Sequence, residues 1–106
     1  MSEYEEILGI KIPNNTNIKA VTNSSKKVLK DSIFFGLQGI NVHGSNYAED
    51  AIKNGASLVV HDDPLYDKNN ERIIFAKNLK KNIVKFLDSF YSIEINSNNF
   101  FAFTGT

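Results

Sequence analysis

Short apolar runs alternate with amphipathic segments along this chain, and this alternation limits the folds that it can adopt. Residues 33–37 form one continuous apolar run, and Leu58, Val59 and Val60 form another within an expected strand at 57–61. Such runs are typical of strands buried on both faces. The intervening segment, residues 46–54, places Tyr47, Ala51 and Ile52 at helical spacing. These three segments predict one strand–helix–strand unit.

The rest of the chain continues the same alternation. Ser45 is positioned to cap the helix at 46–54, and Gly55 to end it. The remaining elements that we expect are a short helix at 2–8, strands at 18–22, 72–76 and 100–103, and a helix at 78–91 that begins at Asn78 and has Leu79, Ile83, Leu87 and Phe90 along one face. The pattern predicts an α/β fold, a small three-layer sandwich with a mixed, largely parallel sheet.

Composition excludes several classes of protein. A chain of 106 residues fits one domain, and its 12 Lys and Arg balance its 12 Asp and Glu, which argues against nucleic-acid and membrane partners. The absence of cysteine excludes disulfides and thiolate metal sites. The acidic start resembles no signal peptide, and no apolar stretch reaches the ~20 residues of a membrane helix. We therefore expect a cytoplasmic protein.

Two polar loops are candidates for ligand binding. The segment 23–27 follows a strand and offers hydroxyls, amides and backbone N–H groups, which suit an anionic or nucleotide ligand. The segment 39–44 lies between a buried strand and a helix, where open α/β sheets bind ligands. The alternative for the second loop is an ordinary turn with glycines for its geometry. His43 and His61 lack metal-ligand spacing, and we interpret His61 as structural.

Four segments, in the right order and at the right separations, resemble the N-terminal part of Mur ligases of the MurE and MurF type. Val28–Gly39 is similar to the family's V-x-x-G-D-L-F-V-A-L-x-G stretch, and Glu49–Val60 to E-x-A-I-x-x-G-A-x-A-V-V. Ser24–Val28 stands where the family has D-S-R-x-V, and Phe103–Thr106 matches the start of T-G-T-N-G-K-T, the ATP loop. The pair Phe90-Tyr91 is similar to a MurE motif and favours that type.

The resemblance implies a function for the chain. Residues 1–103 would be a domain that binds the UDP part of UDP-N-acetylmuramoyl-L-alanyl-D-glutamate, and residues 104–106 would begin the central ATPase domain. The full ligase would use ATP and Mg²⁺ to add a diamino acid, meso-diaminopimelate or lysine, and would need its central and C-terminal domains. This chain alone would hold no catalytic residue or metal ligand and would be inactive. The residues implied for UDP are Asn23, Ser25, Lys26, Ile40, Asn41 and Val42, and those for ATP are Thr104, Gly105 and Thr106.

The chain departs from the family pattern at several positions. Ser24 replaces an Asp, and Lys26 replaces an Arg, which exchanges a fork of donors for a point charge. Asp31 replaces a Gly, and His43 replaces the Asp of an Asp-Gly pair. Two alternatives stay open: a MurF-type domain, whose ligase adds a dipeptide, and a free-standing module that binds a nucleotide sugar.

Overall fold

The computed structural model describes residues 2–38, 43–94 and 100–102. The helices are α1 (Ser2–Leu8), α2 (Ala48–Lys53) and α3 (Leu79–Glu94), with 3₁₀ turns η1 (Ser25–Lys27) and η2 (Gly44–Tyr47). The strands are β1 (Ala20–Thr22), β2 (Ser32–Gly36), β3 (Ala56–His61), β4 (Ile73–Phe75) and β5 (Phe100–Ala102). Each helix and strand expected from the sequence is therefore present, with bounds that differ by a few residues.

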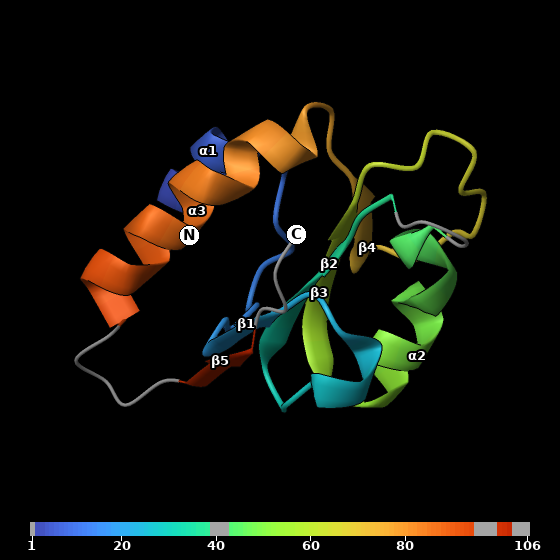
Figure 1. Cartoon of the computed structure of the whole chain (residues 1–106), viewed down its shortest axis with the longest axis horizontal. Coiled ribbons are helices and arrows are strands. Elements are labelled where there is room, and N and C mark those ends of the chain that lie inside the picture. Colours follow the sequence, from blue (N-terminus) through green and yellow to red (C-terminus); the bar gives the residue numbers. More distant parts are fainter. Residues whose placement is uncertain (1, 39–42, 95–99, 103–106) are drawn as a thin grey trace.

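The five strands form one sheet in the order β4-β3-β2-β1-β5. All four neighbouring pairs are parallel, and Figure 1 shows the helices on either side of this sheet. An isolated bridge between Gln38 and His43, outside the strands, is antiparallel. The α/β sandwich with its largely parallel sheet is confirmed.

Two apolar layers flank the sheet. The larger layer joins α1 and α3 to Ile33, Phe35 and Val60 of the strands, and the smaller joins α2 to Phe34 and Val59. Consecutive strand residues thus point to opposite faces and are buried on both. The sheet is the middle layer of three, and the loops lie at the ends of its strands.

Phe86 is a core residue that the expected helix face did not include. Its side chain is fully buried, and its ring lies 4.8 Å from that of Tyr4 and 5.2 Å from that of Phe35. Leu87, which we expected on the buried face, is only partly buried. The helix is turned so that Phe86 contacts both α1 and the sheet, a preference set by those partners rather than by spacing within the helix.

The start of α2 differs from expectation. The expected cap, Ser45, lies within η2, and Tyr47 stands at the N-cap without a side-chain hydrogen bond. Ser45 Oγ instead donates a hydrogen bond to Asp63. The hydroxyl therefore bonds to a residue distant in sequence and does not cap α2. Gly55 does follow α2, with a φ of 119°, a backbone conformation that glycine adopts freely.

The backbone conformation at Asp31 relates to one departure from the family pattern, the replacement of a Gly at this position. Its φ is 62°, in the left-handed region where a residue with a Cβ is strained and glycine is not. Its N–H donates to Gly55 O at 3.0 Å, and its C=O accepts from Lys19 N at 2.7 Å. The backbone here has the geometry that the family's glycine would adopt, and the two hydrogen bonds hold Asp31 in it.

Candidate functional site

The parallel sheet brings the candidate loops to one edge. Strands β1 to β4 end at Thr22, Gly36, His61 and Phe75, and they are consecutive neighbours in the sheet. Because parallel strands share one direction, their carboxyl ends meet at the same edge, where α/β proteins bind ligands. The loop at 23–27 therefore adjoins the one that follows β2.

The loop after β1 is held by hydrogen bonds at both ends. Thr22 Oγ1 is buried and accepts from Ser24 N at 3.0 Å, while Asn54 Nδ2 of the α2 C-terminus donates to Ser25 O at 3.2 Å. Of the residues that we expected to contact UDP, Asn23 and Ser25 are half-buried and Lys26 is exposed. All three lie on this short loop, at the edge where β1 ends.

The loop after β2 is closed by contact between two glycines. A Cβ built on Gly44 would lie 2.8 Å from Gly36 Cα and 2.5 Å from Leu37 N, and Gly44 N donates to Leu37 O at 2.7 Å. The close backbone approach therefore requires glycine at 44. We expected Gly39 to frame this loop, but Gly39 lies outside the described residues.

Six of the predicted site residues lie outside the part of the chain that the structure describes. They are Ile40, Asn41 and Val42 of the second loop, and Thr104, Gly105 and Thr106 of the expected ATP loop. The contacts that we predicted for them remain predictions.

A polar cluster that sequence reasoning missed joins the loops after β2 and β3. His43 Nδ1 accepts from Ser45 N at 3.0 Å, and His43 Nε2 lies 2.7 Å from Asp62 Oδ1. Ser45 is buried, and its Oγ donates to Asp63 Oδ2 at 2.6 Å. The Ser45–Asp63 bond connects residues 18 positions apart in sequence, and the His43–Asp62 contact joins the same two loops. The only local signal was the adjacency of His61, Asp62 and Asp63.

His61 forms the base of the loop after β3. It is 3% exposed, its Nδ1 accepts from Asp63 N at 3.1 Å, and its ring lies 4.8 Å from that of Tyr66. Burial lowers the pKa of His61 below its usual value, an effect that the nearby Asp63 carboxylate opposes. The pKa of Asp63 is itself lowered, mainly by the hydrogen bond from Ser45 and then by the N–H of Leu65. Both shifts favour a neutral imidazole beside an ionised carboxylate.

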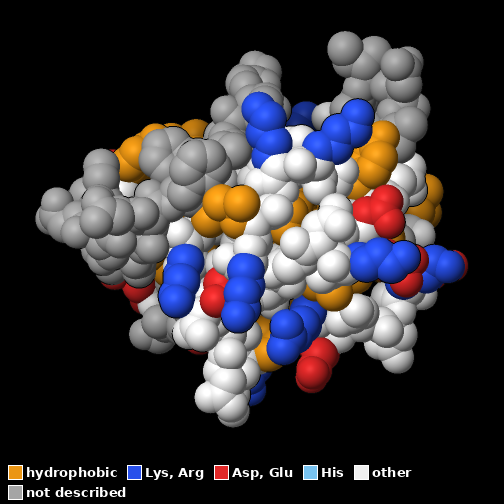
Figure 2. Space-filling model, turned by 90° about the horizontal axis from the view of Figure 1, so that it is seen from below, with side chains coloured by type: hydrophobic (Ala, Val, Ile, Leu, Met, Phe, Trp, Pro, Cys, Tyr) orange, Lys and Arg blue, Asp and Glu red, His pale blue; other side chains and the backbone are white. Residues whose placement is uncertain are grey.

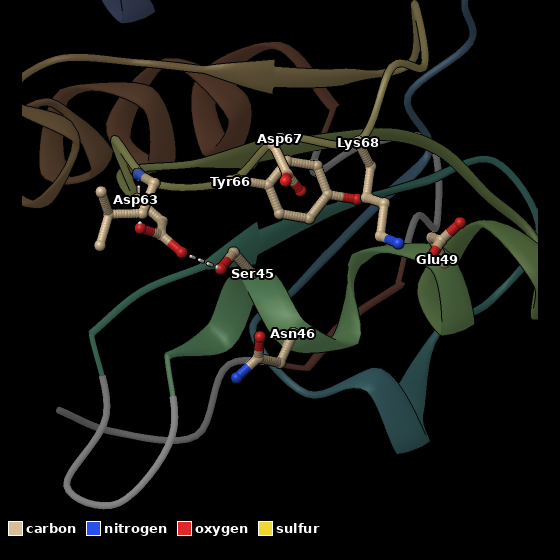
Figure 3. A pocket seen from close by; sticks show the side chains of 8 residues that line it. Ser45, Asn46, Glu49, Asp63, Tyr66, Asp67 and Lys68 are labelled. Atoms are coloured by element: carbon tan, nitrogen blue, oxygen red, sulfur yellow. Dashed lines mark hydrogen bonds between the residues drawn. The ribbon is translucent and has the colours of Figure 1, made fainter.

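Two hollows adjoin this cluster. One has a volume of about 180 Å³ and lies between the cluster and α2, as Figure 3 shows; its lining includes Ser45, Glu49, Asp63, Tyr66 and Lys68. Burial raises the pKa of the Tyr66 phenol, and the carboxylates of Glu49 and Asp67 raise it further. The second hollow, about 430 Å³, lies at the start of α3, and its lining includes Asp62, Phe75 and the lysines Lys77, Lys80 and Lys81.

Neither a metal site nor a membrane-spanning helix is found among the described residues. No group of three or more His, Cys, Asp or Glu side chains among them is placed to hold a metal ion. None of their helices is long and apolar enough to cross a membrane. Figure 2 shows one face, on which the Lys and Arg side chains are separated by uncharged and acidic ones.

Comparison with known proteins adds a family match. A family model described as "Mur ligase family, catalytic domain" matches residues 17–91. A Rickettsia prowazekii UDP-N-acetylmuramoyl-L-alanyl-D-glutamate--2,6-diaminopimelate ligase is 33% identical over 95 residues, which cover 87% of this chain and 18% of that protein. A UDP-N-acetylmuramoyl-tripeptide--D-alanyl-D-alanine ligase of the same organism is 34% identical over 99 residues, covering 93% of this chain and 21% of the ligase.

A solved structure shares the fold. The MurF ligase of Thermotoga maritima, in complex with ADP, aligns with a TM-score of 0.61 at 18% identity, over 76% of this chain and 18% of that one. The chain thus spans about a fifth of the length of the curated relatives that it matches.

Proposed function

The chain belongs to the Mur ligase family, and from this we propose that it is the part of a MurE-type ligase that binds the UDP portion of UDP-N-acetylmuramoyl-L-alanyl-D-glutamate. The whole enzyme would add a diamino acid to the glutamate of that substrate, in the synthesis of peptidoglycan precursors. The relative named as a diaminopimelate ligase supports the choice of reaction.

The observation that carries the proposal is the adjacency of the two loops at the carboxyl edge of the sheet. Asn23 and Ser25 present an amide and a hydroxyl there, and Lys26 a cation. A uracil ring has one N–H donor and two carbonyl acceptors, which short polar side chains and backbone groups can satisfy. The diphosphate would take the charge of Lys26. Ile40, Asn41 and Val42 would close on the nucleotide from the second loop.

The chemistry of ligation requires parts of the enzyme beyond the described residues. ATP would phosphorylate the glutamate carboxylate, and Mg²⁺ would offset the charge that develops in that transfer. The amine of the diamino acid would then displace phosphate from the acyl phosphate. We assign residues 104–106 to the start of the ATP loop and assign no catalytic step to the rest of this chain.

A MurF-type function is the second candidate. The D-alanyl-D-alanine ligase relative is as similar to this chain as the diaminopimelate ligase, at 34% against 33% identity. The two candidates share the UDP-binding role and differ in the group that is added. Incubating the full-length protein with ATP, and with either the dipeptide substrate and a diamino acid or the tripeptide substrate and D-alanyl-D-alanine, would decide between them.

The UDP-binding role is tested by NMR titration of the chain with UDP-N-acetylmuramoyl-L-alanyl-D-glutamate, UDP and ATP in separate experiments. We expect the UDP ligands, and not ATP, to shift the amide signals of Asn23 to Lys26. Ser25→Ala should weaken UDP binding by about 2- to 10-fold, because one hydrogen bond contributes ~0.5–1.5 kcal/mol. Ser92→Ala, on the exposed side of α3, is the matched control. Saturating UDP ligand that left the signals of residues 23–26 unmoved would contradict the proposal.

A further inference from the structure

The side chain of Thr22 fixes the backbone of the loop that follows β1. Thr22 is the last residue of β1 and is only 1% exposed. Its Oγ1 accepts the N–H of Ser24 at 3.0 Å and donates a longer hydrogen bond to Ser24 O at 3.3 Å. A threonine hydroxyl that bonds to the backbone two residues later defines the course of the chain there. The loop therefore leaves the strand in a direction set by a buried side chain.

A second side chain reaches the same loop from the end of α2. Asn54 is the residue that follows this helix, and its backbone N–H donates to Asp50 O at 2.9 Å. Its side-chain Nδ2 donates to Ser25 O at 3.2 Å, although the two residues are 29 positions apart in sequence. The loop is thus bonded to β1 at Ser24 and to the end of α2 at Ser25.

The place of Asn54 beside the loop is set by contacts other than its own side chain. Asp31 N, a few residues after the loop, donates to Gly55 O at 3.0 Å. Val28 packs on the apolar layer that contains Ala48 of α2. The end of α2 is therefore held against the segment that follows the loop, so removal of the Asn54 side chain should leave this packing in place.

These bonds hold the backbone of Ser25 and leave its hydroxyl available. Ser25 is half-buried, and its C=O accepts the hydrogen bond from Asn54. Within residues 2–38, 43–94 and 100–102, Ser25 Oγ takes part in no hydrogen bond. A serine hydroxyl can donate one hydrogen bond and accept others. A ligand at this edge of the sheet would therefore meet a hydroxyl whose backbone is already fixed.

We propose that Thr22 and Asn54 are positioning residues for the UDP ligand, which hold the backbone at Ser24 and Ser25 and, through it, the hydroxyl of Ser25. Neither side chain has to touch the ligand. The proposal rests on the proposed function in one respect, that a UDP ligand binds at the loop after β1. Without the two bonds, binding would have to order the loop, and the conformational entropy lost in that step would reduce the affinity.

Thr22→Val and Thr22→Ser separate the hydroxyl of Thr22 from its packing. Valine keeps the branched shape without the hydroxyl, and serine keeps the hydroxyl without the methyl group. In NMR titrations of the 106-residue chain with UDP, we expect Thr22→Val to bind about 3- to 10-fold more weakly and Thr22→Ser to stay within about 2-fold of the wild type. A role in core packing alone would give the reverse order, because serine leaves a gap that valine fills.

The same variants report on the loop without any ligand. Amide hydrogen exchange of the chain, followed by NMR, measures the protection of the N–H of Ser24, which bonds to Thr22 Oγ1. We expect its protection factor to fall about 10-fold in Thr22→Val and to be retained in Thr22→Ser, because only serine supplies an acceptor. The protection of Val60 in β3 should stay the same in both variants.

Asn54→Ala removes the second bond at an exposed position, and it tests the proposal even if substitution of the buried Thr22 prevents folding. We expect UDP to bind about 2- to 5-fold more weakly, with no change in the urea midpoint of the chain. In the Ser25→Ala variant, the same substitution should change the affinity by less than about 2-fold, because it would no longer position a hydroxyl. Asn69→Ala, in the exposed loop before β4, is the matched control and should bind UDP as the wild type does.

The outcomes distinguish this inference from the proposed function. Wild-type affinity for UDP in Thr22→Val and Asn54→Ala would overturn the positioning role and leave UDP binding in place. An Asn54→Ala effect that is equally large with and without the Ser25 hydroxyl would overturn the action through Ser25. A wild-type chain that binds no UDP would contradict the proposed function and, with it, the positioning of that ligand, while the exchange of the Ser24 N–H still decides whether Thr22 holds the loop.

Discussion

Gly44→Ala tests whether the loop after β2 depends on close backbone contact. A Cβ at this position would lie 2.5 Å from Leu37 N and 2.8 Å from two backbone atoms of Gly36, whereas real Cβ atoms essentially never come within 3.0 Å of such atoms. The backbone must therefore move by roughly half an ångström, which lengthens the hydrogen bond from Gly44 N to Leu37 O. Overpacking of this kind costs about 1–3 kcal/mol.

The net change follows from two opposing effects. Replacing glycine by alanine restricts the unfolded chain and stabilises the fold by ~0.4–1 kcal/mol. With a clash of about 2–2.5 kcal/mol, within that range, Gly44→Ala should lower the free energy of unfolding by about 1–2 kcal/mol. Gly36→Ala meets its nearest atom at 3.0 Å, so clash and restriction should nearly cancel there. The predicted order of stability is wild type, then Gly36→Ala close to it, then Gly44→Ala.

Urea unfolding, followed by circular dichroism, measures these differences. A loss of 1–2 kcal/mol moves the midpoint by about 1 M at the slope of a small domain. Gly9→Ala is the matched control, since Gly9 has a φ of 67° but no atom within 4 Å of a built Cβ; it should destabilise without shifting the amide signals of Leu37 and Ser45. A Gly44→Ala variant as stable as the wild type would refute the close approach.

Three further predictions concern single residues. At Asp31, whose φ is 62°, Asp31→Gly should be more stable than Asp31→Ala by about 1–2 kcal/mol in urea unfolding, because only glycine adopts this conformation without strain; equal stabilities would argue against it. Ser45→Ala should raise the pKa of Asp63, whose largest lowering cause is the Ser45 hydrogen bond, in a ¹³C NMR titration of the carboxyl group, and an unchanged pKa would refute that cause. The lowered pKa of His61 means that the unfolded chain binds a proton first, so stability should be constant above pH 6.5 and fall as the pH drops below it; thermal unfolding between pH 8 and pH 5 would show this fall, and His61→Asn should reduce it.

Much of the fold follows from local sequence. Consecutive apolar residues identify β2 and β3 because a strand covered on both faces has no polar side. Gly55 marks the end of α2 because its φ of 119° excludes most other residues. Phe86 could not be placed in this way. Phe86 and Leu87 both fit the helical spacing, and the choice between them depends on the rings of Tyr4 and Phe35.

The candidate site could likewise be predicted only in part from the sequence. The position of Asn23 and Ser25 at the carboxyl edge could be predicted, since it depends only on strand order and direction. The bond from Ser45 to Asp63 could not, because each residue has a sufficient local explanation: a serine before a helix is read as a cap, and an acidic residue after a strand as solvated. Only the folded structure shows that Ser45 and Asp63 are hydrogen-bonded to each other.

The polar cluster between the loops after β2 and β3 explains one departure from the family pattern, His43. An aspartate at position 43 would face the carboxylate of Asp62, and like charges so close repel. The histidine places Nε2 2.7 Å from Asp62 Oδ1 while its Nδ1 accepts the N–H of Ser45. An aspartate has no proton to offer to Asp62. The residue at 43 is therefore coupled to the residue at 62. A His43→Asp variant of this chain should lose the contact between residues 43 and 62, while the Ser45–Asp63 hydrogen bond remains. Asp62→Asn, which supplies a donor, should restore the contact in the double variant.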